Sequence, residues 1–298
     1  MKKSILKLSM ACLILLGMFT KQAIANNQPG LKVEVSGMGQ PIILIPGITC
    51  AGDVWDETLT AMGDGYQYHV MTLPGFAGNV PLNNVETEGF FSQVEAMILN
   101  YIAENKLKKP IIIGHSLGGF LALKIGISTP DLPSKLVIVD SLPFLAGIQM
   151  PYIQTEEQAT QFAKQVKATM IGSNSQSQEE QMVYQKEMLK SMIRDEDKIA
   201  IAAKWGAQSD VTTITQAMYE MYATDLRQEV AEIKAPTLVL GAWIAYKNYG
   251  VTRESCLASY KAQYQAQPNV TVDLTDNGNH FIMWDDPEFF YNWLNKFL

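Results

Sequence analysis

The sequence contains little cysteine and little histidine. Its 298 residues hold three of each. Cys12, Cys50 and Cys256 form no Cys-x-x-Cys pair, so the chain has neither a dithiol redox motif nor a cysteine zinc motif. The histidines are scattered and do not form a metal-ligand set. We therefore expect no metal and no cofactor, and expect Cys50 and Cys256 either to form one disulfide or to remain two buried thiols.

Positive charge is also scarce, because 23 lysine and arginine residues face 30 acidic ones and the formal net charge is −7. Residues 1–25 carry four of the lysines and no acid, so the chain without them has a formal charge of −11. Such an acidic protein is a poor partner for nucleic acid or for an anionic membrane. Neither is expected as a partner.

Long apolar runs are missing after the first stretch of the chain. Lys2 and Lys3 precede a mostly apolar run over residues 5–19, and Ala-Ile-Ala follows at 23–25. This pattern predicts a secretory signal peptide over residues 1–25, and hence a periplasmic or secreted protein. The run is too short for an anchor helix, and Lys7 interrupts it, so no stable membrane anchor is expected after cleavage.

The remaining chain alternates between short β-branched runs and segments with helical periodicity. Alternation of this kind predicts a doubly wound, mostly parallel α/β sheet. The expected strands cover residues 31–35, 41–45, 66–73, 110–113, 135–140, 237–241 and 269–274.

Residues 141–234 break this rhythm, since they contain no convincing strand and four helical segments. These segments are expected over residues 155–170, 178–193, 196–207 and 212–222. We predict a core formed by residues 26–140 and 235–298, with a helical cap over residues 141–234.

The most informative stretch is Gly-His-Ser-Leu-Gly at residues 114–118, directly after three isoleucines. A buried strand is expected to end at Gly114 and a helix to leave at Leu117. Such a sharp turn strains the backbone at Ser116 and lifts its hydroxyl clear of the sheet. The stretch resembles the nucleophile elbow of the α/β-hydrolase family, and the insertion at residues 141–234 resembles the helical cap of that family. This resemblance implies a serine nucleophile at Ser116.

A serine nucleophile needs a base to accept its proton. Residues 278–287 read Gly-x-His-Phe-x-x-x-x-x-Pro and resemble the pattern that closes the family's chains, which makes His280 the expected base. His115 occupies the variable position of the elbow and is expected to pack beside the site. His69 lies within a strand and is expected to be structural.

The negative charge that develops on the substrate carbonyl needs N–H donors. Residues 46–48, Pro-Gly-Ile, resemble the family's His-Gly-x loop with proline in place of histidine. By that resemblance, the backbone N–H groups of Ile48 and Leu117 form the oxyanion hole.

The third member of the triad departs from the common family pattern. The acid usually follows the strand that here covers residues 237–241, but Ala242, Trp243 and Ile244 stand there. A second family position, used in haloalkane dehalogenases, corresponds to Asp140 at the end of the preceding strand. We predict Asp140 as the acid, with Asp276 and Glu254 as alternatives.

Asp225 lies where the chain leaves the cap, and an ion pair or a structural role in the cap is expected there. Phe76, Phe144, Met150 and Trp243 flank the site in sequence order and are candidate residues of the substrate pocket.

Together these features predict a carboxylesterase-like serine hydrolase that acts on a small-molecule ester, thioester or lactone. One alternative is a non-catalytic or slowly turning-over ligand receptor on the same fold, and another is a C–C bond hydrolase with the same triad. The sequence does not specify the acyl group or the oligomeric state.

Overall fold

The computed structural model describes residues 22–23, 30–150, 152–172 and 178–298. The predicted signal peptide lies outside these residues except for Gln22–Ala23, which forms the short strand β1. The further strands, α-helices (α) and 3₁₀ helices (η) are β2 (Lys32–Gly37), β3 (Gly39–Ile45), η1 (Gly52–Trp55), α1 (Asp56–Met62), β4 (Gly65–Thr72), α2 (Val85–Glu88), α3 (Phe90–Glu104), β5 (Ile111–His115), α4 (Leu117–Ser128), β6 (Lys135–Val139), α5 (Leu145–Gln149), α6 (Glu156–Gly172), α7 (Gln178–Leu189), α8 (Glu196–Ala207), α9 (Val211–Ala223), η2 (Glu229–Glu232), β7 (Thr237–Ala242), η3 (Ile244–Tyr249), α10 (Arg253–Gln263), β8 (Val270–Thr275), α11 (Ile282–Asp285) and α12 (Pro287–Phe297).

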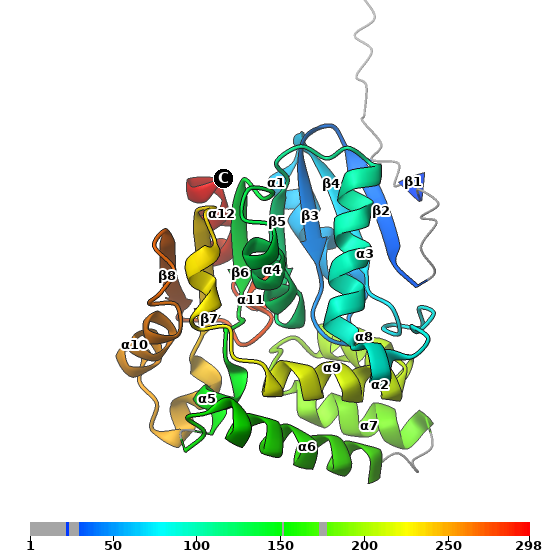
Figure 1. The fold of residues 1–298 in the computed structure, drawn as a ribbon, viewed down its shortest axis with the longest axis vertical. Helices are drawn as coiled ribbons and strands as arrows, with labels where there is room; N and C mark the ends of the chain where they lie inside the picture. The colour runs from blue at the N-terminus through cyan, green and yellow to red at the C-terminus, as the bar shows by residue number, and fades with distance from the viewer. Residues whose placement is uncertain (1–21, 24–29, 151, 173–177) are drawn as a thin grey trace, which may run out of the picture.

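The strands form one sheet in the order β1-β2-β4-β3-β5-β6-β7-β8 (Figure 1). β2 runs antiparallel to β1 and β4, whereas the strands from β4 to β8 are paired in parallel. The crossovers between parallel strands are made by helices, as parallel pairing requires. The predicted doubly wound, mostly parallel sheet is confirmed.

Helices cover both faces of the sheet because its central strands are apolar on both sides. In β3, Ile43 and Ile45 pack with residues of α3 and α4, whereas Ile42 and Leu44 pack with η1 and α12 on the other face. Successive strand residues point to opposite faces, so a continuous apolar run buries itself twice. The strand order places β5 and β6 among the inner strands of the sheet.

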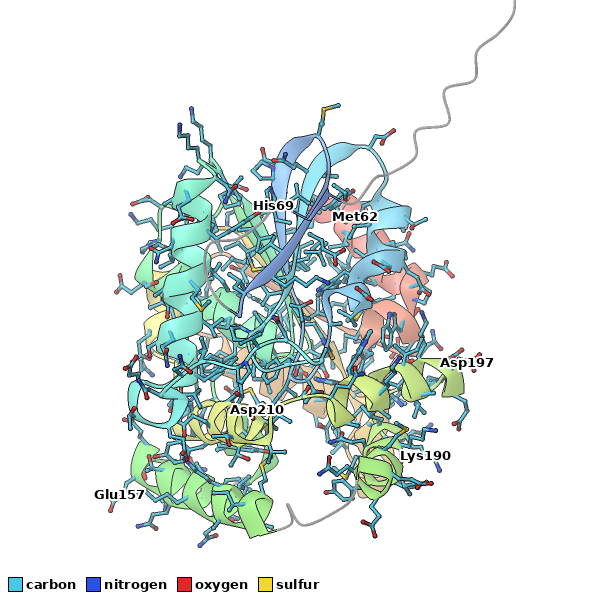
Figure 2. All side chains as sticks on the ribbon, turned by 90° about the vertical axis from the view of Figure 1, so that its right-hand side faces the viewer. Met62, His69, Glu157, Lys190, Asp197 and Asp210 are labelled. Carbon is cyan, nitrogen blue, oxygen red and sulfur yellow. The ribbon has the colours of Figure 1, made fainter. Side chains whose placement is uncertain are left out.

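Helices α5 to α9 form the all-helical insertion between β6 and β7, and they lie together below the sheet in Figure 1. Within it α6 packs against α9, and α7 packs against α8. Figure 2 shows Glu157 of α6 and Lys190, just after α7, on opposite sides of this region. In the described part of the chain, no helix is both long and apolar enough to span a membrane.

A carboxylate from the insertion caps a helix of the core. Glu220 of α9 accepts hydrogen bonds from the backbone N–H groups of Phe90, at 2.7 Å, and Phe91, at 3.0 Å. These residues begin α3, where free N–H groups and the helix dipole favour a negative charge. Gln216 also donates to Glu220, at 2.6 Å. Glu220 therefore joins the helical insertion to the core.

Replacing Glu220 with alanine is expected to lower the free energy of unfolding by about 1–2 kcal/mol, the usual cost of losing a helix cap. Urea unfolding followed by circular dichroism measures this change. Glu104→Ala is the control, because Glu104 is an exposed residue at the far end of α3, and it should change stability by less than about 0.5 kcal/mol. Equal effects of the two substitutions would contradict this role of Glu220.

Candidate active site

Ser116 lies in the sharp turn between β5 and α4, as predicted. Its backbone angles are φ 53° and ψ −120°, a strained combination for a residue with a side chain. Its N–H donates to the carbonyl oxygen of Val139 at 2.8 Å, which fixes the turn against β6. A Cβ at Gly118 would come within 2.3 Å of the carbonyl oxygen of Ile45, so only glycine permits the helix to start so close to β3.

Asp140 and His280 come together although they lie 140 residues apart in the sequence. His280 Nδ1 lies 2.6 Å from Asp140 Oδ2. Because a carboxylate accepts, Nδ1 carries a proton, and in the neutral imidazole Nε2 is then the acceptor. The His280 side chain is 25% exposed and that of Asp140 is 12% exposed. The imidazole can therefore meet a ligand, while the carboxylate is shielded from water.

The second carboxylate oxygen of Asp140 binds two donors that the sequence did not reveal. Oδ1 accepts the N–H of Ala242 at 2.8 Å and the hydroxyl of Tyr260 at 2.5 Å. Tyr260 belongs to α10, a helix that was not predicted. Tyr264, directly after the end of this helix, stands four residues from Tyr260, and that spacing was the available signal of their shared orientation.

The alternative acids have other partners or lie in water. Asp276 Oδ1 accepts hydrogen bonds from Arg253 Nε at 3.0 Å and from Trp243 Nε1 at 3.1 Å. Glu254 is exposed in the first turn of α10. Asp225 forms the expected ion pair, with Arg227 at 2.6 Å. Among these carboxylates, Asp140 is the one hydrogen-bonded to the His280 imidazole.

The loop that carries His280 is held by side chains on both sides. The Thr275 hydroxyl accepts the N–H of Gly278 at 2.9 Å. Asp285 accepts the N–H of Asn279 at 2.9 Å and, with its other oxygen, the N–H of Arg194 at 3.0 Å. Burial raises the pKa of Asp285. These bonds tie the His280 loop to the segment that follows α7.

His115 is fully buried beside the site, as expected. The centres of the His115 and His280 rings lie 4.6 Å apart. Because Ser116 directly follows His115, Ser116 and His280 lie at the same edge of the sheet. His115 Nε2 donates to the carbonyl oxygen of His280 at 3.1 Å. Burial holds the pKa of His115 well below its usual value, and the neighbouring His280 lowers it further. His115 therefore remains neutral and supports the backbone of His280.

The loop after β3 contacts the elbow. A Cβ at Gly47 would lie 2.9 Å from His115 Nδ1 and 3.3 Å from Ser116 Cβ, so the loop passes directly beside the serine. Ile48 follows in this loop, and Leu117 begins α4. In the described part of the chain, neither of their N–H groups donates a hydrogen bond to another residue. Both are available to an oxyanion.

The four candidate pocket residues have different immediate neighbours. Phe76 is buried against Phe90 of α3, with ring centres 5.4 Å apart. Phe144 and Met150 share a small apolar cluster with α6. Trp243 lies at the start of η3 and binds Asp276.

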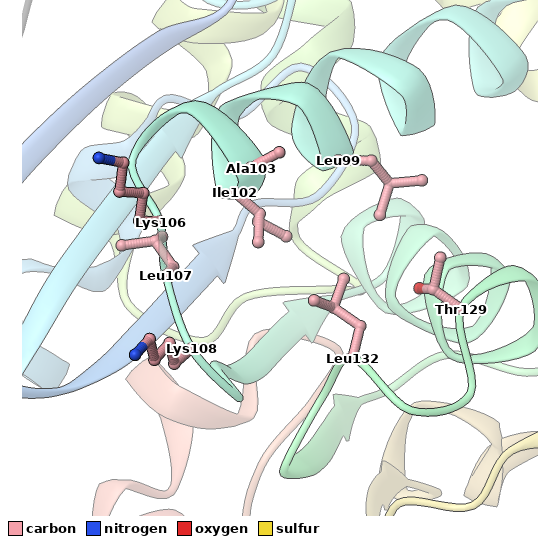
Figure 3. Close-up of a pocket in the computed structure, with 8 residues that line it drawn as sticks. All are labelled: Leu99, Ile102, Ala103, Lys106, Leu107, Lys108, Thr129 and Leu132. Carbon is pink, nitrogen blue, oxygen red and sulfur yellow. The ribbon is translucent and has the colours of Figure 1, made fainter.

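A cavity of about 430 Å³ lies near the start of β5, at the end of the sheet opposite Ser116 (Figure 3). Its walls include Leu99 and Ile102 of α3, Leu107, and Leu132 after α4. Leu107 precedes β5, whereas Ser116 follows it, so this cavity lies away from the serine and cannot deliver a substrate to it.

The two cysteines of the described chain, Cys50 and Cys256, are free and buried. Burial raises the pKa of Cys50 to about 12 and that of Cys256 to about 11, the latter with a further contribution from the charge of Asp140. Both remain protonated, and such thiols are poor nucleophiles. Within the described residues, no three His, Cys, Asp or Glu side chains form a group that could hold a metal ion.

His69 is structural, as expected. Its Nδ1 lies 2.7 Å from the Tyr101 hydroxyl and its Nε2 lies 3.2 Å from Gln67 Oε1. Burial lowers the pKa of His69 to about 4. The folded protein keeps this imidazole neutral, whereas the unfolded chain binds a proton below about pH 6.5. Its contribution to stability is present above that pH and is lost as the pH falls toward 4.

Between pH 7 and pH 5, the free energy of unfolding of the wild type should fall by about 2 kcal/mol more than that of His69→Gln. Urea unfolding of both proteins at the two pH values measures the difference. The carboxylates and His115 are common to both proteins, so their contributions cancel. An unchanged pH dependence in the variant would show that His69 is protonated in the folded protein.

The mostly parallel sheet with helices on both faces agrees with the comparison to known families. The model of a family described as "Alpha/beta hydrolase family" matches residues 42–293. The chain belongs to the alpha/beta hydrolase family. It is therefore an enzyme of a hydrolase family, with the helical insertion between β6 and β7.

Similar proteins include two curated hydrolases. The chain is 27% identical over 219 residues to the pimeloyl-(acyl-carrier protein) methyl ester esterase of Vibrio cholerae. The match covers 70% of this chain and 76% of the Vibrio protein. It is 22% identical over 276 residues to the N-formylmaleamate deformylase of Pseudomonas putida, and this match covers 89% of this chain and 91% of the deformylase. An esterase structure from Exiguobacterium antarcticum has a TM-score of 0.71 at 18% identity, covering 94% of this chain and 99% of that one, and shares the fold.

Proposed function

We propose that this hydrolase cleaves a carboxylic ester, thioester or lactone through an acyl-enzyme on Ser116. His280 acts as the base and Asp140 as the orienting acid. The observation that carries the proposal is the 2.6 Å contact between His280 Nδ1 and Asp140 Oδ2, beside a serine on a strained turn. A nucleophile, a base and an orienting carboxylate on these three elements form the set that acyl transfer requires.

In the proposed reaction, Ser116 Oγ attacks the substrate carbonyl and its proton passes to His280 Nε2. Asp140 stabilises the imidazolium that forms and keeps the proton on Nδ1. The same imidazolium then donates its Nε2 proton to the departing alcohol or thiol. Water attacks the acyl-enzyme by the reverse proton path, which releases the acid and regenerates Ser116.

The oxyanion formed in each step is assigned to the N–H groups of Ile48 and Leu117. The close approach of Gly47 to Ser116 supports this assignment, as does the absence of another acceptor for either N–H in the described chain. One such donor lowers the barrier by about 3 kcal/mol in other serine hydrolases. Because both donors are backbone groups, the aliphatic side chains of these residues are compatible with the role.

The proposed substrate class rests on the similar proteins and on the open side of the imidazole. One curated relative is named as a methyl ester esterase, and a similar solved structure is an enol-lactonase from Burkholderia xenovorans, with a TM-score of 0.71 at 14% identity. The substrate is proposed to be a small acyl compound that enters beneath the helical cap of residues 141–234. Phe76, Phe144, Met150 and Trp243 remain predictions as pocket residues.

Steady-state hydrolysis of p-nitrophenyl esters from acetate to laurate tests the function, with a thioester and a lactone assayed in parallel. We expect turnover that depends on Ser116, with a preferred chain length that sizes the acyl site. Activity equal to that of Ser116→Ala on every substrate would contradict the proposal. That result would favour the receptor hypothesis.

Export is proposed from the pattern of residues 1–25. Expression of the full chain in an exporting host, followed by intact-mass measurement of the purified protein, tests it. A protein that begins after residue 25 supports the proposal, whereas an uncleaved cytoplasmic product contradicts it.

A further inference from the structure

In much of the family, the acid follows the strand that corresponds to β7. Here no acid stands there, and Asp140, directly after β6, is held by donors from β7 and α10. Ala242, at the end of β7, donates its N–H to Asp140 Oδ1, and the hydroxyl of Tyr260 donates to the same oxygen at 2.5 Å. Tyr260 is buried. Burial raises its pKa well above the usual value, and the charge of Asp140 raises it further, so the phenol keeps the proton that it donates.

The approach of Tyr260 to Asp140 depends on a glycine. A Cβ at Gly241 would lie 2.5 Å from Cε1 and 2.6 Å from Cζ of the Tyr260 ring. No side chain fits at that separation, so the ring occupies the space that glycine leaves beside β7. Gly241 and Tyr260 therefore form one structural unit, although 19 positions separate them in the sequence.

Helix α10 is fixed at both ends, so the hydroxyl of Tyr260 has little freedom. At its start, Arg253 binds Asp273 at 2.7 Å and Asp276 at 3.0 Å. At its end, Gln263 accepts the N–H of Phe144 at 3.1 Å. The next residue, Tyr264, donates its hydroxyl to the carbonyl oxygen of Ser141 at 2.7 Å. The helix is thus attached both to β8 and to the segment directly after Asp140.

We propose that Tyr260 is a positioning residue that holds the Asp140 carboxylate in the orientation that presents Oδ2 to His280. The inference rests on the proposed function of the triad. With Oδ1 bound by two donors from β7 and α10, the carboxylate cannot rotate, and its Oδ2 lone pairs face the imidazole. Without the Tyr260 hydroxyl, Ala242 alone holds Oδ1, and the carboxylate can turn about its side-chain bonds. Small errors in catalytic geometry lower rates strongly.

Tyr260→Phe tests this role, and Tyr68→Phe is its matched control. Both variants remove the hydroxyl of a buried tyrosine, but that of Tyr68, in β4, donates to the backbone carbonyl oxygen of Gly63 at 2.7 Å and not to Asp140. We expect Tyr260→Phe to lower kcat about tenfold or more, with KM changed by less than about twofold. Tyr68→Phe should change kcat by less than about twofold. Thermal unfolding of both variants corrects the comparison for losses of folded protein.

A second readout does not depend on turnover. The chain contains only three histidines, so the imidazole signals of a ¹⁵N-histidine sample are few. We expect Tyr260→Phe to shift the Nδ1–H proton resonance of His280 and Tyr68→Phe to leave it in place. Equal kcat losses in the two variants, or a resonance that neither variant moves, would overturn the inference. If the wild type shows no Ser116-dependent turnover, the proposed function fails, while the resonance still tests the Tyr260 contact.

Discussion

Replacing Ser116 with alanine is expected to lower kcat for ester hydrolysis by about 10⁶-fold, as loss of the nucleophile does in another serine hydrolase. The variant should fold normally, because the strain of the turn lies in the backbone of residue 116 and alanine adds no bulk. Stopped assays with p-nitrophenyl butyrate measure the loss. Labelling with a fluorophosphonate, followed by intact-mass spectrometry, shows whether one adduct forms on the wild type and none on the variant.

Ser128→Ala is the matched control for this substitution. Ser128 ends the same helix, α4, and its hydroxyl donates to Glu95 at 2.5 Å, far from the elbow. This variant should keep its activity and its fluorophosphonate adduct. Retained hydrolysis in Ser116→Ala, or an adduct mapped by peptide analysis to another serine, would contradict the assignment of the nucleophile.

Replacing Asp140 with asparagine is expected to lower kcat by about 10⁴-fold, the size seen when this acid is removed in another serine hydrolase. The reason lies in the donors around Oδ1. Ala242 and Tyr260 both donate to that oxygen, so the amide oxygen of an asparagine would face them and its NH₂ would face His280. Nδ1 would then have to accept a hydrogen bond, and the imidazole proton would move to Nε2. Nε2 is the atom that must be unprotonated to take the proton of Ser116.

Asp276→Asn and Glu254→Gln are the controls, since the sequence left these two acids as alternatives. Neither residue contacts His280 in the structure, and each variant should keep kcat within about threefold of the wild type, since it leaves the triad geometry in place. Nitrogen chemical shifts of labelled histidine report the tautomer of His280 directly. A larger loss in Asp276→Asn than in Asp140→Asn would reassign the acid.

Much of the fold could be predicted because apolar periodicity is a local property. The isoleucine and valine runs of β3, β5 and β6 need to be buried on both faces, and only a parallel sheet covered by helices does so. α8 was predicted with the observed bounds. Helix α10 was missed because it is mostly polar and its buried positions include Cys256, Tyr260 and Gln263, which do not form an apolar stripe.

The serine and the histidine of the site were predictable for a similar reason. Each lies in a short motif whose neighbours have a local role: Gly118 permits the turn at Ser116, and Gly278 belongs to the loop before His280. The acid lies in no such motif. Asp140 and Asp276 each follow a strand and Glu254 lies in α10, and their order along the chain does not say which one reaches an imidazole.

The sequence by itself determined the sheet, the helical insertion and the turn that carries Ser116, since these follow from residue patterns a few positions long. Only the tertiary structure decided which of the carboxylates binds His280 and what holds that carboxylate in place. Asp140, Tyr260 and His280 come from three elements that are distant in the chain, and their contacts depend on strand order and on the packing of α10 over Gly241. Hydrogen bonds act over about 3 Å, so their partners are set by where the chain is placed and not by its local pattern.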